Sequence, residues 1–106
     1  MEGIVEVYAR QGPVLRALAD AATDDPEVEQ VYGGLVQSFI DVTTHHIEAE
    51  VEAGRVLPLD AAETARALVW MMERYLNRAM GHERIKRELV TDTLTTIWTR
   101  VLYATG

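Results

Sequence analysis

The sequence predicts an all-α domain, and two observations carry that prediction. Apolar residues recur at helical spacing along almost the whole chain. By contrast, β-branched residues never alternate with polar ones over a useful length, and no Asn-Gly or Asp-Gly pair marks a hairpin turn. The 106 residues fit one domain, and a hydrophobic content of 48% is enough for one core.

The first two helices are expected to be short. One spans about residues 2–10 and ends at Gly12-Pro13, because proline lacks an N–H group and disfavours helix in the residue before it. The other spans about residues 13–22, with its proline at a tolerated first-turn position.

The third helix is expected to be long, from residue 26 to about residue 53. Asp25 can cap its start, and Gly54 can end it. The pair Gly33-Gly34 weakens this helix by about 1 kcal/mol per glycine relative to alanine. The sequence therefore predicts a compensating feature at the pair, which is either a close approach of another backbone or room for another group.

The last two helices are expected over about residues 61–80, between Asp60 as a cap and Gly81 as a stop, and from about residue 83 or 84 to residue 103. Each carries two adjacent apolar rows. In the fourth helix the rows are Ala65, Val69, Met72, Leu76, Met80 and Leu68, Met71, Tyr75, Ala79. In the fifth helix they are Val90, Leu94, Trp98, Leu102 and Leu89, Thr93, Ile97, Val101.

A helix at the edge of a small domain needs only one apolar face. Two rows on each of two neighbouring helices therefore predict two burials, one in the chain's own core and one against a second copy, in a two-fold four-helix interface. The alternative is that the five helices cover both rows within one chain.

Composition excludes several classes of protein. There is no cysteine, so disulfides, thiolate metal sites and cysteine nucleophiles are absent. No apolar run is long enough to span a membrane. The N-terminus lacks the basic region and apolar run of a signal peptide, so a cytoplasmic protein is expected. The net charge is −7, and the basic residues are scattered, which disfavours direct contact with DNA by this chain.

The sequence contains no recognisable catalytic set. There is no Gly-rich phosphate loop and no Gly-x-Ser-x-Gly motif, and Ser38 is the only serine. We therefore expect a protein that is not an enzyme and that needs no cofactor.

A metal site is the first alternative interpretation of the third helix. Asp41 and His45, and likewise His46 and Glu50, lie one helical turn apart, with Glu48 between the pairs. However, the chain contains neither Glu-x-x-His nor His-Glu-x-x-His. A solvated acidic face is the favoured interpretation, and no metal is expected.

Two further features have two interpretations each. Glu73-Arg74 lies inside an apolar helix, either as a polar anchor in a pocket or interface or as an exposed flank with Arg74 paired to an acid. The apolar stripe of the third helix is either ordinary core or, beside the Gly33-Gly34 gap, one wall of a ligand cavity. Polar groups for such a cavity are available from Thr43, Asn77 and Gln37.

The chain resembles the C-terminal regulatory domain of the tetracycline-repressor (TetR) family of bacterial transcription factors, and within it the ethionamide-resistance-repressor branch. The matching stretches are residues 67–76 (ALVWMMERYL), 92–103 (DTLTTIWTRVLY) and 47–54 (IEAEVEAG), with the acidic-Pro start at Asp25-Pro26. The resemblance covers essentially all of residues 1–106 and implies a five-helix regulatory domain whose last two helices form a four-helix-bundle dimer interface.

The resemblance also implies site residues. An apolar tunnel for an effector would be lined by Tyr8, Tyr32, Leu35, Val36, Phe39, Val42, Thr43, Val69, Met72, Leu76 and Trp98. Val7 and Tyr8 would close one end of it. The dimer interface would comprise Leu68, Met71, Tyr75, Ala79, Leu89, Thr93, Ile97 and Val101. Met72 stands where the branch often has a ligand-binding asparagine, which implies a more purely apolar effector.

The function expected from the resemblance is that of a small-molecule-sensing, dimerising domain of a bacterial transcriptional repressor. Its partners would be a second copy, a small apolar effector and, through an N-terminal helix-turn-helix head absent from this chain, DNA; no membrane is involved. The alternatives are a structural helical interaction module without a ligand and a His/carboxylate metal-binding helical protein.

Overall fold

The computed structural model describes residues 17–82 and 85–103, and this part of the chain is helical without strands. It confirms the predicted all-α class. Residues 17–22 are helical, and the longer elements are α2 (Pro26–Glu52), α3 (Ala61–Leu76), the π-helix η1 (Asn77–His82) and α4 (Arg87–Tyr103). The first predicted helix, over residues 2–10, lies outside the described residues, as does the first part of the second.

The helix α2 begins and ends where local sequence signals predict. The Asp25 carboxylate accepts hydrogen bonds from the backbone N–H groups of Glu27 and Val28, at 3.0 and 3.4 Å, which satisfies donors that a helix start leaves open. Gly54 follows the C-terminus with φ of 79°, a left-handed conformation that suits a residue without Cβ.

The helix α3 starts as predicted and ends differently. The carboxylate of Asp60 accepts from the backbone N–H of Glu63 at 3.0 Å. The prediction of one α-helix to residue 80 is wrong, because the chain changes to a π-helix at Asn77. The side-chain amide of Asn77 donates to the carbonyl oxygen of Glu73 at 3.1 Å. A side chain that occupies a carbonyl of the preceding turn competes with regular helix hydrogen bonding, which favours a change of helix type here.

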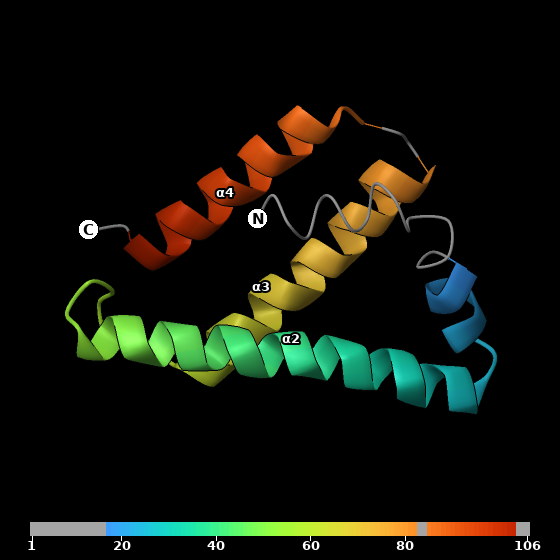
Figure 1. Cartoon of the computed structure of the whole chain (residues 1–106), viewed down its shortest axis with the longest axis horizontal. Coiled ribbons are helices and arrows are strands. Elements are labelled where there is room, and N and C mark those ends of the chain that lie inside the picture. The colour runs from blue at the N-terminus through green and yellow to red at the C-terminus, as the bar shows by residue number, and fades with distance from the viewer. Residues whose placement is uncertain (1–16, 83–84, 104–106) are drawn as a thin grey trace.

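The helices form an open arrangement in which α3 crosses α2 obliquely and α4 returns toward the C-terminal end of α2 (Figure 1). The fifth predicted helix begins at Arg87, later than expected, and ends at Tyr103 as expected. None of the helices in the described residues is both long and apolar enough to cross a bilayer.

The core consists of two clusters. The first joins residues of α2, the following loop, α3 and the end of α4: Tyr32, Val36, Ile40, Ile47, Val56, Ala65, Leu68, Val69 and Leu102. The second joins α3, η1 and α4: Met72, Leu76, Ala79, Val90 and Leu94. Trp98 packs against both clusters and so lies at their boundary. Ile47 and Leu76 are fully buried, and each such side chain contributes about 1.5–3 kcal/mol by leaving water.

Candidate functional site

A buried polar cluster ties α2 to the end of α3. The hydroxyl of Tyr32 donates to a carboxylate oxygen of Glu73, and the Asn77 Nδ2 group donates to the same oxygen at 2.8 Å. Asn77 Nδ2 also lies 3.3 Å from the Tyr32 hydroxyl. Glu73 and Asn77 are only 4% and 3% exposed. We call these three residues the buried polar cluster.

The buried polar cluster is costly to place in an apolar core. A carboxyl group removed from water needs hydrogen bonds or an opposite charge. Among the described residues, no basic side chain forms an ion pair with Glu73. Its compensation in this part of the chain therefore comes from the two donors on Tyr32 and Asn77.

Two buried polar atoms near the boundary of the core clusters have no hydrogen-bond partner in the described structure. They are the Oδ1 atom of Asn77 and the Nε1 atom of Trp98. Asn77 is linked to the first core cluster through Tyr32 and directly follows Leu76 of the second in sequence. Trp98 packs against both clusters. One open acceptor and one open donor are thus present among the buried polar atoms of the described residues.

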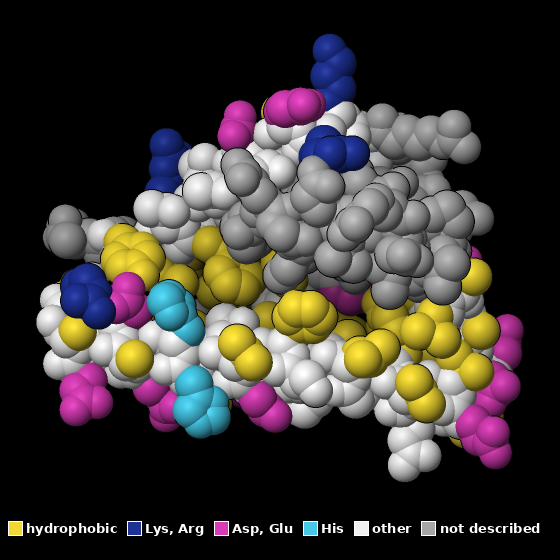
Figure 2. Space-filling model, viewed as in Figure 1, with side chains coloured by type: hydrophobic (Ala, Val, Ile, Leu, Met, Phe, Trp, Pro, Cys, Tyr) yellow, Lys and Arg dark blue, Asp and Glu magenta, His cyan; other side chains and the backbone are white. Residues whose placement is uncertain are grey.

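A second feature is an apolar stripe on the outside of α2. Val31, Leu35, Phe39 and Val42 are 61%, 49%, 48% and 71% exposed. Their spacing of four, four and three residues places them on one helix face. Figure 2 shows hydrophobic side chains in a row along this part of the molecule. We call these four residues the α2 stripe.

The helix α4 is apolar on two sides. Val90, Leu94 and Leu102 are buried, whereas Leu89 and Val101 are 57% and 48% exposed. Thr93 and Ile97 complete the outer row and are partly buried. A helix with one apolar row in the core and a second one facing outward is typical of a helix that also packs against a partner.

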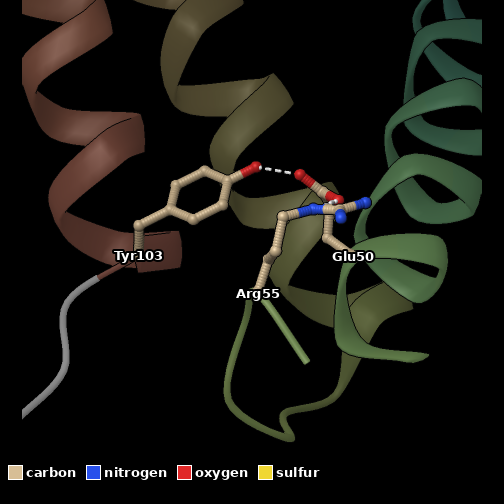
Figure 3. A network of polar contacts seen from close by, with 3 residues as sticks. All are labelled: Glu50, Arg55 and Tyr103. Atoms are coloured by element: carbon tan, nitrogen blue, oxygen red, sulfur yellow. Dashed lines mark hydrogen bonds and ion pairs between the residues drawn. The ribbon is translucent and has the colours of Figure 1, made fainter. Parts of the chain in front are cut away.

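A surface network joins the ends of α2 and α4. Tyr103 donates its hydroxyl to Glu50 at 2.6 Å, and the guanidinium of Arg55 donates to the other oxygen of the same carboxylate at 2.5 Å (Figure 3). The hydrogen bond from Tyr103, followed by that from Arg55, lowers the pKa of Glu50. The same bond to Glu50 raises the pKa of Tyr103.

The residues considered for a metal site do not converge. The ring Nδ1 of His45 lies 2.8 Å from the backbone oxygen of Asp41, and Glu50 is engaged by Tyr103 and Arg55. Within residues 17–82 and 85–103, no three His, Asp or Glu side chains are grouped so that they could hold a metal ion.

Comparison with known proteins decides the family. The profile of a family described as "Transcriptional regulator EthR, C-terminal domain" matches residues 1–104. The chain is also 34% identical, over 93 residues, to a protein named "HTH-type transcriptional regulator EthR" from Mycolicibacterium smegmatis, strain ATCC 700084 / mc(2)155. The match covers 85% of this chain and 43% of that relative, so the chain spans less than half the length of the relative.

The chain belongs to the EthR C-terminal-domain family.

The predicted tunnel residues of this EthR-type domain are buried, partly buried or exposed. The buried ones are Tyr32, Val36, Val69, Met72 and Leu76, and the partly buried ones are Thr43 and Trp98. The remaining ones on α2, namely Leu35, Phe39 and Val42, belong to the exposed α2 stripe. Val7 and Tyr8 lie outside the described residues. The structure therefore places Tyr32, Val36 and Val69 in the first core cluster and Met72 and Leu76 in the second, with Trp98 packed against both. The third group lies on the outer face of α2.

The predicted interface residues of the EthR-type domain divide in a similar way. Met71, Leu89 and Val101 are exposed, Tyr75, Thr93 and Ile97 are partly buried, and Leu68 and Ala79 lie in the core clusters. On α4 the whole outer row is accessible at least in part. The row on α3 and η1 is split, because Leu68 and Ala79 at its two ends pack inward.

Sequence reasoning missed the partnership between Tyr32 and Glu73. It left Glu73-Arg74 with two interpretations, and the structure assigns one to each residue: Glu73 is a buried anchor, and Arg74 is exposed. The spacing of Glu73 and Asn77 by four residues is a local signal for a side-chain hydrogen bond. Contact with Tyr32, 41 positions away, has no such signal.

Proposed function

We propose that this EthR-type domain senses a small, mainly apolar effector and forms a dimer, and that DNA is bound by a helix-turn-helix head outside these 106 residues. The observation that carries the proposal is the buried polar cluster set among apolar side chains. Effector sites are mostly apolar with a few placed polar groups, and Tyr32, Glu73 and Asn77 provide such groups between α2 and α3. Membership of a regulator family supports the same role.

The proposed mechanism is a shift between two dimer geometries. An effector that binds one geometry better than the other changes their populations by its difference in affinity. The buried polar cluster joins α2 to α3, while the outer row of α4 would join two copies. A change in how α2 and α3 pack would therefore be transmitted to the dimer interface through Trp98, which contacts both core clusters.

Dimer formation can be tested on α4. We expect the chain to be a dimer at micromolar concentration by light scattering, and Leu89→Asp to convert it to a monomer, because burying an unpaired charge in an apolar interface is costly. Leu57→Asp is the matched control, since Leu57 is as exposed as Leu89 but lies in the loop before α3. A strictly monomeric wild-type chain at that concentration would contradict the proposed dimer.

Effector binding can be tested with Nile red as an apolar probe. We expect saturable binding with a rise in the thermal unfolding temperature, as for any ligand that prefers the native state. Val36→Ala or Met72→Ala, at two buried tunnel residues, is expected to change the affinity for the probe more than the dimer dissociation constant. Equal effects on both quantities would reject the assignment of these residues to the pocket.

A structural module without effector is the second candidate. It is favoured by the tight burial of the tunnel residues Val36, Val69 and Leu76 in the core. The surface pocket between the end of α2 and the start of α3 is lined by other residues, Glu48, Val51, Glu52, Leu59, Asp60, Ala61 and Ala62. This pocket is open and acidic, and it includes none of the predicted tunnel residues. A dimer that binds no Nile red under any condition would support this second candidate.

The proposed N-terminal DNA-binding head can be tested by determining the coding sequence upstream of residue 1. A preceding helical segment of about 50 residues with a basic helix-turn-helix would support DNA binding by the whole protein. An in-frame stop codon directly upstream would contradict it.

A further inference from the structure

The helix α2 is apolar over a wider arc than its own core uses. The four residues of the α2 stripe are between 48% and 71% exposed. The residue that follows each of the first three in sequence is buried in the first core cluster, namely Tyr32, Val36 and Ile40. A helix at the surface of a small domain needs only one apolar face. The α2 stripe is therefore a surplus apolar face beside the one that packs inward.

The size of the α2 stripe limits what can cover it. At the observed exposures its four residues present on the order of 400 Å² of surface, within the range of roughly 300–600 Å² that often marks a functional patch on a monomer. A standard interface buries about 800 Å² per partner, so the stripe alone is small for a stable dimer. Residues 31–42 span about 17 Å along the helix axis, which is the length of a short helix laid along α2.

The backbone of the partner is constrained as well. The described residues contain no strands, so this part of the chain offers no sheet edge to an extended peptide. An extended peptide on an apolar helix face would leave backbone N–H and C=O groups without partners. An amphipathic helix satisfies its own backbone and brings a row of apolar side chains at matching spacing.

The charge of α2 selects the sign of the partner. The helix contains neither Lys nor Arg, and its charged residues are Glu27, Glu29, Asp41, Glu48, Glu50 and Glu52. Glu27 lies one turn before Val31, Asp41 is next to Val42, and both carboxylates are exposed. In Figure 2, acidic side chains border the row of hydrophobic side chains along this edge of the molecule. Such a face repels the α2 helix of a second copy and an anionic bilayer, and it attracts a basic partner.

We propose that the α2 stripe is a docking surface for a basic amphipathic helix of a partner protein, whose Lys or Arg residues face Glu27 and Asp41. Burial of the apolar side chains supplies the affinity. The carboxylates beside the stripe supply the selection of the partner and its orientation. This surface is separate from the buried polar cluster and from the outer row of α4, so the proposal adds a partner to the domain beyond an effector and a second copy.

The test uses labelled peptides and the 106-residue chain. Two 14-residue peptides carry leucines at the same helical spacing, with Lys at all other positions in one and Glu in the other. A third peptide has the composition of the Leu/Lys peptide in an order that places its leucines on no single face. We expect the Leu/Lys peptide to bind at least about tenfold more tightly than the other two by fluorescence anisotropy. The scrambled peptide controls for attraction by the net charge of −7.

Substitutions assign the binding to the α2 stripe. Leu35→Ser and Phe39→Ser are each expected to weaken the Leu/Lys peptide about five- to tenfold, with the helix content of the chain unchanged because both side chains are exposed. Leu57→Ser is the matched control, since Leu57 is 61% exposed outside the stripe. Asp41→Asn is expected to weaken the same peptide about two- to fivefold. Asp92→Asn removes an exposed carboxylate from α4 and should have no such effect.

Each contrary outcome identifies a different error. Equal binding of the ordered and scrambled Leu/Lys peptides, or unchanged affinity in both Leu35→Ser and Phe39→Ser, would overturn the proposal. Loss of binding only in Leu89→Ser would move the docking to α4 and would also overturn it. Self-association that Phe39→Ser abolishes would assign the stripe to a second copy. None of these results affects the tests of the proposed function, which measure Nile red binding and the response of the dimer to Leu89→Asp.

Discussion

The glycine pair in α2 offers a sharp test of the described fold. The sequence predicts that something offsets the helix-weakening effect of Gly33 and Gly34. In the described residues, nothing lies within 4 Å of the position that a Cβ atom would take at either glycine. Gly34 is exposed and Gly33 is partly buried, both in the middle of α2. A methyl group at either position therefore meets open space.

The expected effect of Gly34→Ala follows from helix propensity alone. Alanine is favoured over glycine by about 1 kcal/mol in a helix interior, and the methyl group adds no clash here. Unfolding 106 residues has an entropy of roughly 0.2 kcal/mol/K, so the unfolding temperature should rise by about 4–5 °C. Gly33→Ala should act similarly, and the two substitutions should be nearly additive in free energy.

The assay is thermal and urea denaturation followed by circular dichroism, at one fixed protein concentration because dimerisation would shift the transition. The matched control is Ala49→Gly, which makes the reverse change at an exposed position of the same helix and should cost about 1 kcal/mol.

A loss of stability in Gly34→Ala, with Ala49→Gly behaving as expected, would refute the reasoning. It would mean that another part of the protein or a second copy approaches the helix backbone at this point. The glycine pair would then be a contact site and not an uncompensated weakness.

Further predictions concern the core, the buried polar cluster and the surface network. Leu94→Ala should lower the free energy of unfolding by about 2–5 kcal/mol in urea denaturation, because Leu94 is 1% exposed. Leu89→Ala on the outer row should change the stability of the monomer by under about 0.5 kcal/mol. Similar losses in the two variants would contradict the division of α4 into a buried face and an outer face. Tyr32→Phe should cost about 1–3 kcal/mol by leaving Glu73 and Asn77 with fewer partners, and an unchanged free energy of unfolding would argue against the cluster. Because the folded-state pKa of Glu50 is lowered from 4.5, its contribution to stability is present above that value and is lost as the pH falls through the folded-state pKa. Tyr103→Phe should therefore raise the Glu50 pKa toward its ordinary value in an NMR titration, and an unchanged titration would show that the bond in Figure 3 is not formed in solution.

Local signals predicted the ends of the helices better than the faces they bury. The Asp25 cap and the Gly54 stop depend on neighbouring residues only, and both were predicted correctly. Spacing on α2 shows which residues share a face, but not which of two adjacent faces turns inward. The structure buries Tyr32, Val36 and Ile40 and leaves the α2 stripe outside.

The candidate site was predicted only in part for the same reason. Tyr32 and Asn77 were named as single residues, but their meeting at Glu73 depends on how α3 crosses α2. The π-helix escaped prediction because an α-turn and a π-turn at the end of a helix bury similar apolar residues, and the hydrogen bond from the Asn77 side chain to the Glu73 carbonyl accompanies it. Hydrophobic periodicity carries no information about such a bond.

The π-helix has a consequence for how relatives of this chain should be aligned. A π-turn holds one more residue than an α-turn, so it corresponds to a single-residue insertion in an otherwise continuous α-helix. Deleting one residue within 77–82 would return this turn to α-helical geometry and leave the α3 residues before it on the same helix faces. Relatives that differ by one residue at this point should therefore be compared by structural register, since a gap placed elsewhere would pair residues on different helix faces.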